Sequence, residues 1–148
     1  MRLGNFQIAS SLELPFEGEL WDLHNGANFL GLQLLPSDNT AVMNWSSTTP
    51  PRLLGRHGVK LLFEGVQFVQ ISARDTAWPL TEDTCLADIL KVDPNLPHAD
   101  PRLRAISDFS DHFRLLFCFQ SRRIIEIGSA TVKLIPVSGK DPAETHLL

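Results

Sequence analysis

Three side chains just before the last predicted strands have the types and spacing of a catalytic group. Asp108, Asp111 and His112 lie close together in the sequence. A carboxylate beside an imidazole can orient the ring and raise its basicity, as proton transfer requires. A turn capped by aspartate at the entry to a strand explains the same residues and is favoured. An enzyme that uses these three residues is therefore kept as an alternative.

Cys85 is a second candidate for chemistry. It lies near the start of a predicted helix, where the helix dipole would lower the thiol pKa. If it also faced a histidine, it could act as a nucleophile. Its position on an apolar face favours a buried, inert thiol. Cys118 lies inside the most apolar segment and is expected in the core, and two cysteines are too few for a disulfide scaffold.

A third group combines carboxylates and an imidazole near the N-terminus. Oxygen and nitrogen ligands so close in sequence could hold a divalent metal ion. A solvated loop with turn-forming polar residues is the favoured interpretation, so we expect neither a metal site nor a cofactor. The residues are Glu17, Glu19, Asp22 and His24.

The aromatic residues suggest where a binding surface could lie. Nine Phe and three Trp occur without any Tyr, and because binding surfaces favour Tyr, Trp and Arg, most of these rings are expected in the core. The tryptophans lie near loops or strand ends, and a local basic patch follows the second of them. An exposed Trp beside Arg52 or Arg56 would make a binding hot spot. The candidate binding residues are Trp21, Trp45, Arg52, Arg56, His57 and Trp78.

Motifs and composition limit the classes of function. The chain has no phosphate-binding G-x-x-x-x-G-K loop, no G-x-S-x-G elbow, no C-x-x-C pair and no H-E-x-x-H. Its 148 residues, 43% hydrophobic and 20% charged, predict one globular domain over residues 1–148. The net charge of −4 argues against nucleic acid as the main partner.

The chain shows no segment expected to enter a membrane. The residues after Met1 lack the apolar core of a signal peptide. The longest apolar run, Leu115–Phe119, is far too short to span a bilayer. We therefore expect a cytoplasmic protein with no membrane partner, and the oligomeric state stays open.

The last third of the chain gives the clearest structural pattern. Alternating apolar residues predict three consecutive antiparallel strands, over Phe113–Phe119, Ile124–Ile127 and Val132–Ile135. The first strand is apolar on both parities, which predicts a central strand covered on both faces and packed beneath a helix. A four-residue loop built on a type I turn is expected at 120–123.

Weaker patterns fill the earlier part of the chain. Residues 29–46 predict a hairpin that turns at Ser37-Asp38-Asn39. Residues 59–71 predict one long bent strand with a bulge near Gly65. Apolar residues at i, i+3 and i+4 predict a helix between Thr81 and Pro94. The fold class is therefore mainly β (α+β): an antiparallel, strongly bent sheet or partly closed barrel or sandwich with one helix packed on it.

The segment Val59-Lys60-Leu61-Leu62-Phe63-Glu64-Gly65-Val66, together with the late strands, resembles small uncharacterised bacterial β-rich proteins. Some of these are immunity proteins of polymorphic toxin systems. The resemblance covers about a third of the chain and rests on hydrophobic pattern, so it transfers no site residues. It implies a non-enzymatic protein that binds a cognate partner. The acidity of the chain would suit a basic partner, such as a nuclease toxin.

These observations favour a non-catalytic binding or interaction protein, with an immunity-type role as its most specific form. A small-ligand-binding β-barrel is one alternative, because a barrel can bind a ligand in its interior or at its mouth. The enzyme that uses Asp108, Asp111 and His112 is the other. Function is expected in the loops at 15–28, 46–58 and 93–111.

Overall fold

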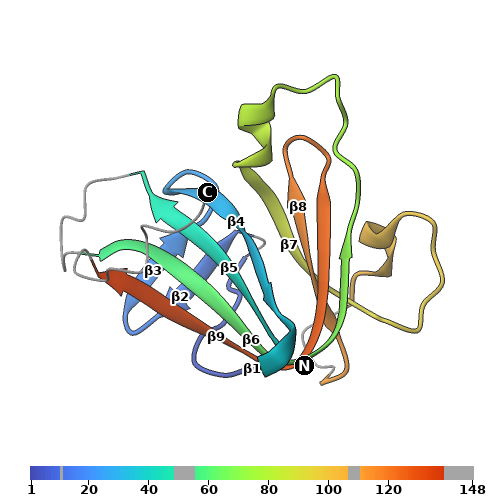
Figure 1. Cartoon of the computed structure of the whole chain (residues 1–148), viewed down its shortest axis with the longest axis horizontal. Coiled ribbons are helices and arrows are strands. Elements are labelled where there is room, and N and C mark those ends of the chain that lie inside the picture. Colours follow the sequence, from blue (N-terminus) through green and yellow to red (C-terminus); the bar gives the residue numbers. More distant parts are fainter. Residues whose placement is uncertain (11, 49–55, 107–110, 139–148) are drawn as a thin grey trace.

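The computed structural model describes residues 1–10, 12–48, 56–106 and 111–138, and it shows a strongly curled antiparallel sheet that forms a half-barrel (Figure 1). The strand order is β4-β5-β6-β9-β8-β7, with the short β1 added in parallel to β9. A separate hairpin is formed by β2 and β3. The strands are β1 (Arg2–Leu3), β2 (Glu13–Phe16), β3 (Glu19–Asp22), β4 (Ala27–Leu35), β5 (Thr40–Ser47), β6 (Arg56–Ile71), β7 (Leu86–Val92), β8 (Arg114–Phe119) and β9 (Ile124–Ser138).

Two long strands, β6 and β9, form the spine of the sheet. They pair from Arg56 opposite Ser138 to Ile71 opposite Ile125. Strand β5 pairs with the first part of β6, whereas β8 pairs with the first part of β9. Because β6 and β9 are antiparallel, these neighbours lie at opposite ends of the spine. The sheet therefore divides into two wings, one with β4 and β5 and the other with β7 and β8 (Figure 1).

The spine bends where its pairing is irregular. Gly65 has a left-handed φ of 64°, and the register shifts between Val66 and Phe68. The prediction of one bent strand over 59–71 is therefore confirmed, with the bulge just after the glycine. The prediction of two separate strands, Ile124–Ile127 and Val132–Ile135, is wrong, because β9 runs without a break from Ile124 to Ser138. Strand β6 offers backbone partners on both sides of Gly128, so the chain has no reason to turn there.

The inner face of the curled sheet is filled by aromatic rings from both wings. Phe29 of β4 lies 5.2 Å from Trp45 of β5 and 4.8 Å from Phe119 of β8, measured between ring centroids. Phe117 of β8 lies 6.1 Å from Trp45 and 6.2 Å from Phe63. The β2–β3 hairpin adds the buried Leu14 and Phe16 to the same core. These rings occupy the region that an interior ligand of a barrel would fill.

The predicted helix before Pro94 is wrong. Residues 86–92 form strand β7, and the described residues contain no helix of seven or more residues, only short 3₁₀ turns at Pro36–Asp38 (η1), Leu80–Asp83 (η2) and Pro101–Arg104 (η3). The register between β7 and β8 shifts between Leu86 and Asp88. That bulge places Leu86 and Ile89 on one face, opposite Phe119 and Phe117. A bulged strand thus produced the i, i+3 spacing that suggested a helix.

Strand β8 is covered on both faces, as predicted, although it is not central. It lies second from the edge of the sheet, next to β7, and the described residues contain no helix of seven or more residues that could cover it. Its outward-facing Leu116 and Cys118 pack with Val92. Residues 93–106, including η3, line this outer face and bond back to the β7 edge through Asp93 N to Arg104 O and Ile106 N to Lys91 O. An irregular segment therefore takes the place expected for the helix.

The predicted β4–β5 turn is confirmed, and so is the predicted length of the loop between β8 and β9. The hairpin of β4 and β5 turns through η1, and Asn39 takes the left-handed conformation expected of a turn asparagine. Four residues, 120–123, connect β8 to β9, with Arg122 at a left-handed φ of 63°.

Among the described residues, no helix has the length and apolarity needed to cross a membrane.

A substitution of Gly58 tests how closely the backbones of β5 and β6 approach each other. A Cβ atom placed there would lie 2.2 Å from the carbonyl oxygen of Trp45, a backbone atom that cannot move aside. We expect Gly58→Ala to lower the free energy of unfolding by about 3 kcal/mol, measured by chemical denaturation. The exposed neighbour His57, changed to Ala, should have an effect within about 0.5 kcal/mol. Equal effects of the two changes would contradict the close approach.

Candidate functional site

The expected Asp108–Asp111–His112 group is only partly described, because Asp108 lies outside the described residues. Asp111 and His112 are both exposed, just before β8. The backbone carbonyl of Asp111 accepts a hydrogen bond from the N-terminal amine of Met1, at 3.2 Å. Neither residue lines the clefts described below.

The structure does place a histidine beside Cys85, but in an unsuitable arrangement for catalysis. His24 Nδ1 lies 3.5 Å from Cys85 Sγ and 2.6 Å from the carbonyl oxygen of Leu86. Because a carbonyl can only accept, Nδ1 must carry the proton and donate it to Leu86. That nitrogen therefore cannot take a proton from the thiol. Burial, and then the negative charge of Glu82, raise the pKa of Cys85, which further disfavours the thiolate.

The four residues considered as metal ligands are divided among separate structural roles. Glu17 and Glu19 bind Arg56 at the β2–β3 hairpin, at 3.6 and 2.6 Å. Asp22 accepts hydrogen bonds from the backbone N–H groups of His24 and Asn25. Within the described ranges, no three His, Cys, Asp or Glu side chains gather as they would around a metal ion.

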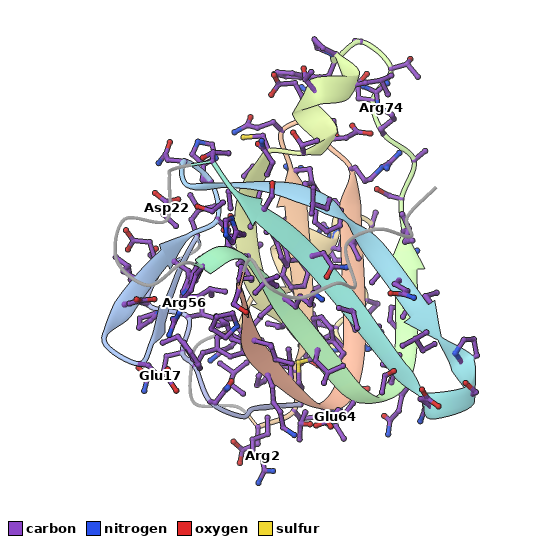
Figure 2. All side chains as sticks on the ribbon, turned by 60° about the vertical axis from the view of Figure 1, so that its left-hand side comes forward. Arg2, Glu17, Asp22, Arg56, Glu64 and Arg74 are labelled. Atoms are coloured by element: carbon purple, nitrogen blue, oxygen red, sulfur yellow. The ribbon has the colours of Figure 1, made fainter. Side chains whose placement is uncertain are left out.

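The binding candidates are scattered over the molecule. Trp45 is buried in the core, and Trp21 is half-buried, each with its indole N–H enclosed and without a hydrogen-bond partner among the described residues. Arg56 is occupied by its two glutamates, beside Glu17 in Figure 2. His57 is exposed, and Arg52 lies outside the described residues. The expected hot spot of Trp beside Arg52 or Arg56 is therefore not visible.

Trp78, however, is exposed and lies beside other arginines. With 38% of its surface accessible, it lines a cleft of about 580 Å³ over β7, β8 and the start of β9. Ala87, Cys118 and Ile124 are apolar residues of this lining. The polar lining residues are Asp88, Arg102, Gln120 and Arg122. A tryptophan and arginines around an apolar floor form the combination found at binding hot spots.

The loop that carries Trp78 is fixed by ion pairs and backbone bonds. Arg74 binds the carboxylate of Asp83 at 3.0 Å and also donates to the carbonyl oxygen of Trp78. Arg123, on the β8–β9 turn, reaches Asp83 at 3.4 Å from the other side. Asp75 N donates to the carbonyl of Ser121 at 3.0 Å. Figure 2 shows Arg74 beside η2, at the opposite end of the molecule from Arg2.

The charges at the cleft are balanced locally. Arg122 lies 3.5 Å from Asp75, and Arg102 donates to both carboxylate oxygens of Asp100, which lowers the pKa of Asp100 to about 2. At the floor, burial and then the negative charge of Asp88 raise the pKa of Cys118 to about 11. The cleft thus offers an apolar floor and oriented cations, without a reactive thiol.

Sequence reasoning named Trp78 but missed Arg102 and Arg122. Arg102 lies in a proline-rich segment whose path over the outer face has no local signal in the sequence. Arg122 follows Gln120-Ser121 in a turn that was predicted, so its exposure could have been inferred. Comparison of the chain with protein-family models, curated proteins and solved structures finds no match.

The surroundings of Cys85 predict that its thiol reacts slowly with alkylating reagents. In a Cys118→Ala variant, which leaves Cys85 as the only thiol, we expect iodoacetamide at pH 8 to react about threefold or more slowly than with free cysteine, since the raised pKa leaves less thiolate. Adding His24→Ala should not slow the reaction further. A marked slowing, followed by mass spectrometry, would show that His24 activates the thiol.

The Trp78 loop should depend on the charge of Asp83. Burial acts to raise the pKa of this carboxyl, but hydrogen bonds from Ser121 and Arg74 and the charge of Arg123 outweigh it and lower the pKa. The carboxylate is therefore the stabilising form: its contribution is complete above about pH 4, the pKa of an unfolded aspartate, and is lost as the pH falls through the folded pKa. Asp83→Asn should cost about 1 to 2 kcal/mol of unfolding free energy at pH 7.

The same comparison at pH 3 should show a smaller difference, because below about pH 4 the unfolded aspartate takes up a proton, which favours unfolding of the wild type. Chemical denaturation at the two pH values measures both differences. Asp38→Asn, on the exposed β4–β5 turn, is the matched control and should have little effect at either pH. A constant difference between wild type and Asp83→Asn would exclude the ionised carboxylate as the cause.

Proposed function

We propose that the protein is a non-catalytic binding protein that docks a protein partner at the Trp78 cleft. The observation that carries this proposal is the exposed indole of Trp78 beside Arg102 and Arg122, over the apolar floor at Cys118 and Ile124. An aromatic or aliphatic side chain of a partner would fit the floor. A neighbouring polar group would then meet the guanidinium groups.

The fixed loop supports docking by a preformed surface. Ordering a flexible loop on binding costs free energy, whereas a loop that is already held loses little. The pairs of Asp83 with Arg74 and Arg123 hold this loop before any partner arrives. The absence of a suitable proton acceptor at Cys85, and the raised pKa of Cys118, favour binding over catalysis at these thiols.

An immunity-type role, in which the partner is a toxin that the protein neutralises, is the most specific form of the proposal. The net charge of −4 supports a basic partner, because opposite net charges accelerate encounter. A ligand inside the half-barrel is less favoured, since the rings of Trp45, Phe63 and Phe117 pack together there.

Affinity capture with matched variants tests the proposal. Purified wild-type protein, Trp78→Ala and Leu103→Ala would each be used to capture proteins from a lysate of the source cell. Leu103 is 63% exposed and does not line the cleft, so it controls for loss of surface hydrophobicity. We expect one protein to be retained by wild type and Leu103→Ala and reduced about tenfold or more with Trp78→Ala, as for a hot-spot residue.

If the three proteins capture the same set in equal amounts, docking at this cleft is wrong. The immunity-type form requires more: the captured protein must inhibit growth when expressed alone, and co-expression of wild type must relieve that inhibition. A captured protein without toxicity would leave the docking proposal standing and remove the immunity role.

A further inference from the structure

A buried ion cluster lies on the outer face of the sheet, apart from the Trp78 cleft. Glu126 of β9 is only 3% exposed and binds two arginines: Arg104 of η3, with Nη2 2.5 Å from Oε2, and Arg114 of β8, with Nη1 3.2 Å from Oε1. Desolvation of charged groups offsets much of their mutual attraction, so such a cluster is weak evidence of a purely stabilising role. Two guanidinium groups here share one carboxylate.

Both arginines are held in place by further contacts. Arg104 also donates to the carbonyl oxygen of Asp93, at 3.4 Å. The guanidinium of Arg114 stacks on Phe68, 3.7 Å from the ring centroid. Its aliphatic part runs over Gly128, where a Cβ would lie 3.2 Å from Cγ. The glycine thus leaves the room that Arg114 occupies, and the two cations are oriented before any ligand binds.

A hollow of about 310 Å³ opens beside this cluster. Its charged lining residues are Arg104, Arg114 and Glu126, which gives two positive charges and one negative. Asn95 and Gln70 add amide groups to the lining. His98, also in the lining, accepts a hydrogen bond at Nδ1 from Asp100 N, so the neutral ring carries its proton on Nε2 and is a donor there. The hollow is therefore rich in donors and locally positive in an acidic protein.

We propose that this hollow binds a small oxyanion, a carboxylate or a phosphate group, through Arg104 and Arg114. Glu126 balances only one of the two positive charges, and a bound oxyanion would balance the other. The paired N–H donors of each planar guanidinium group match the spacing of the oxygen atoms of an oxyanion. Glu126 is a positioning residue that holds the guanidinium groups of Arg104 and Arg114 at a fixed separation. The volume lies at the small end of ligand sites, about 300 to 1,000 Å³, which fits a compact anion. The site shares no lining residue with the Trp78 cleft, so it does not rest on the proposed function.

Titration of the full-length protein tests the site. Inorganic phosphate and malonate would be added separately at constant ionic strength, balanced with sodium chloride, while amide NMR signals are followed. We expect saturable shifts in the segments 95–104, 114 and 126. Saturation by phosphate alone assigns a phosphate ligand, and saturation by malonate alone assigns a carboxylate. If neither anion gives saturable shifts beyond those of chloride, the proposal is overturned.

The affinity of substituted proteins for the anion tests whether it binds in this hollow. Arg114→Gln should weaken binding on the order of tenfold or more, as expected for loss of a charged hydrogen-bond partner. Arg122→Gln makes the same charge change at a side chain that is 72% exposed and outside the hollow, so it should not. If Arg114→Gln fails to fold, Gln70→Glu places a negative charge in the lining at an exposed position and should weaken binding in its place. Equal affinity in wild type and Gln70→Glu, or equal weakening by Arg122→Gln, would overturn the site.

Discussion

The pairing of β6 with β9 is the constraint on which the rest of the structure depends. Each strand is long enough to belong to both wings of the sheet, and both pass the same bend, where Phe68 lies opposite Gly128. Because backbone groups pair on both sides of the bend, neither strand can end there without leaving polar groups unsatisfied. The two wings therefore curl toward each other, and rings from β4, β5 and β8 meet on the inner face.

The two faces of the sheet are closed in different ways. On the inner face, buried aromatic and aliphatic side chains exclude water without any need for polar partners. On the outer face, a segment without regular strands lies along the sheet, so its own polar groups need partners. Backbone bonds from Asp93 and Ile106 meet part of that need, and Arg104 reaches Glu126 across the sheet surface. The outer cover is consequently built from directional contacts, which leave hollows between them.

The sequence predicted the strands that obey simple alternation and failed where a local irregularity changed the period. The run of apolar residues at both parities over Leu115–Phe119 correctly indicated a strand buried on both faces. The bulge in β7 shifted Leu86 and Ile89 to one face, which gives the spacing of a helix. Strand β9 was predicted as two strands because no local pattern reveals that β6 pairs with it on both sides of Gly128. Trp78 could be named from residue type alone. Its arginine neighbours, and the approach of Arg104 and Arg114 to Glu126, depend on contacts between distant segments that no local pattern encodes.

Several arginines of the described structure join peripheral segments to the main sheet. Arg56 holds the β2–β3 hairpin, Arg74 and Arg123 hold the loop at Asp83, and Arg104 holds the 93–106 segment. Ion pairs depend on pH through the charge of their carboxylates, and salt weakens those that reach the solvent, whereas the apolar core depends on neither in this way. The segments that form both outer clefts are therefore stabilised by a different force from the one that stabilises the half-barrel. A change in ionic strength or pH can alter the shape of the clefts while the sheet beneath them stays folded.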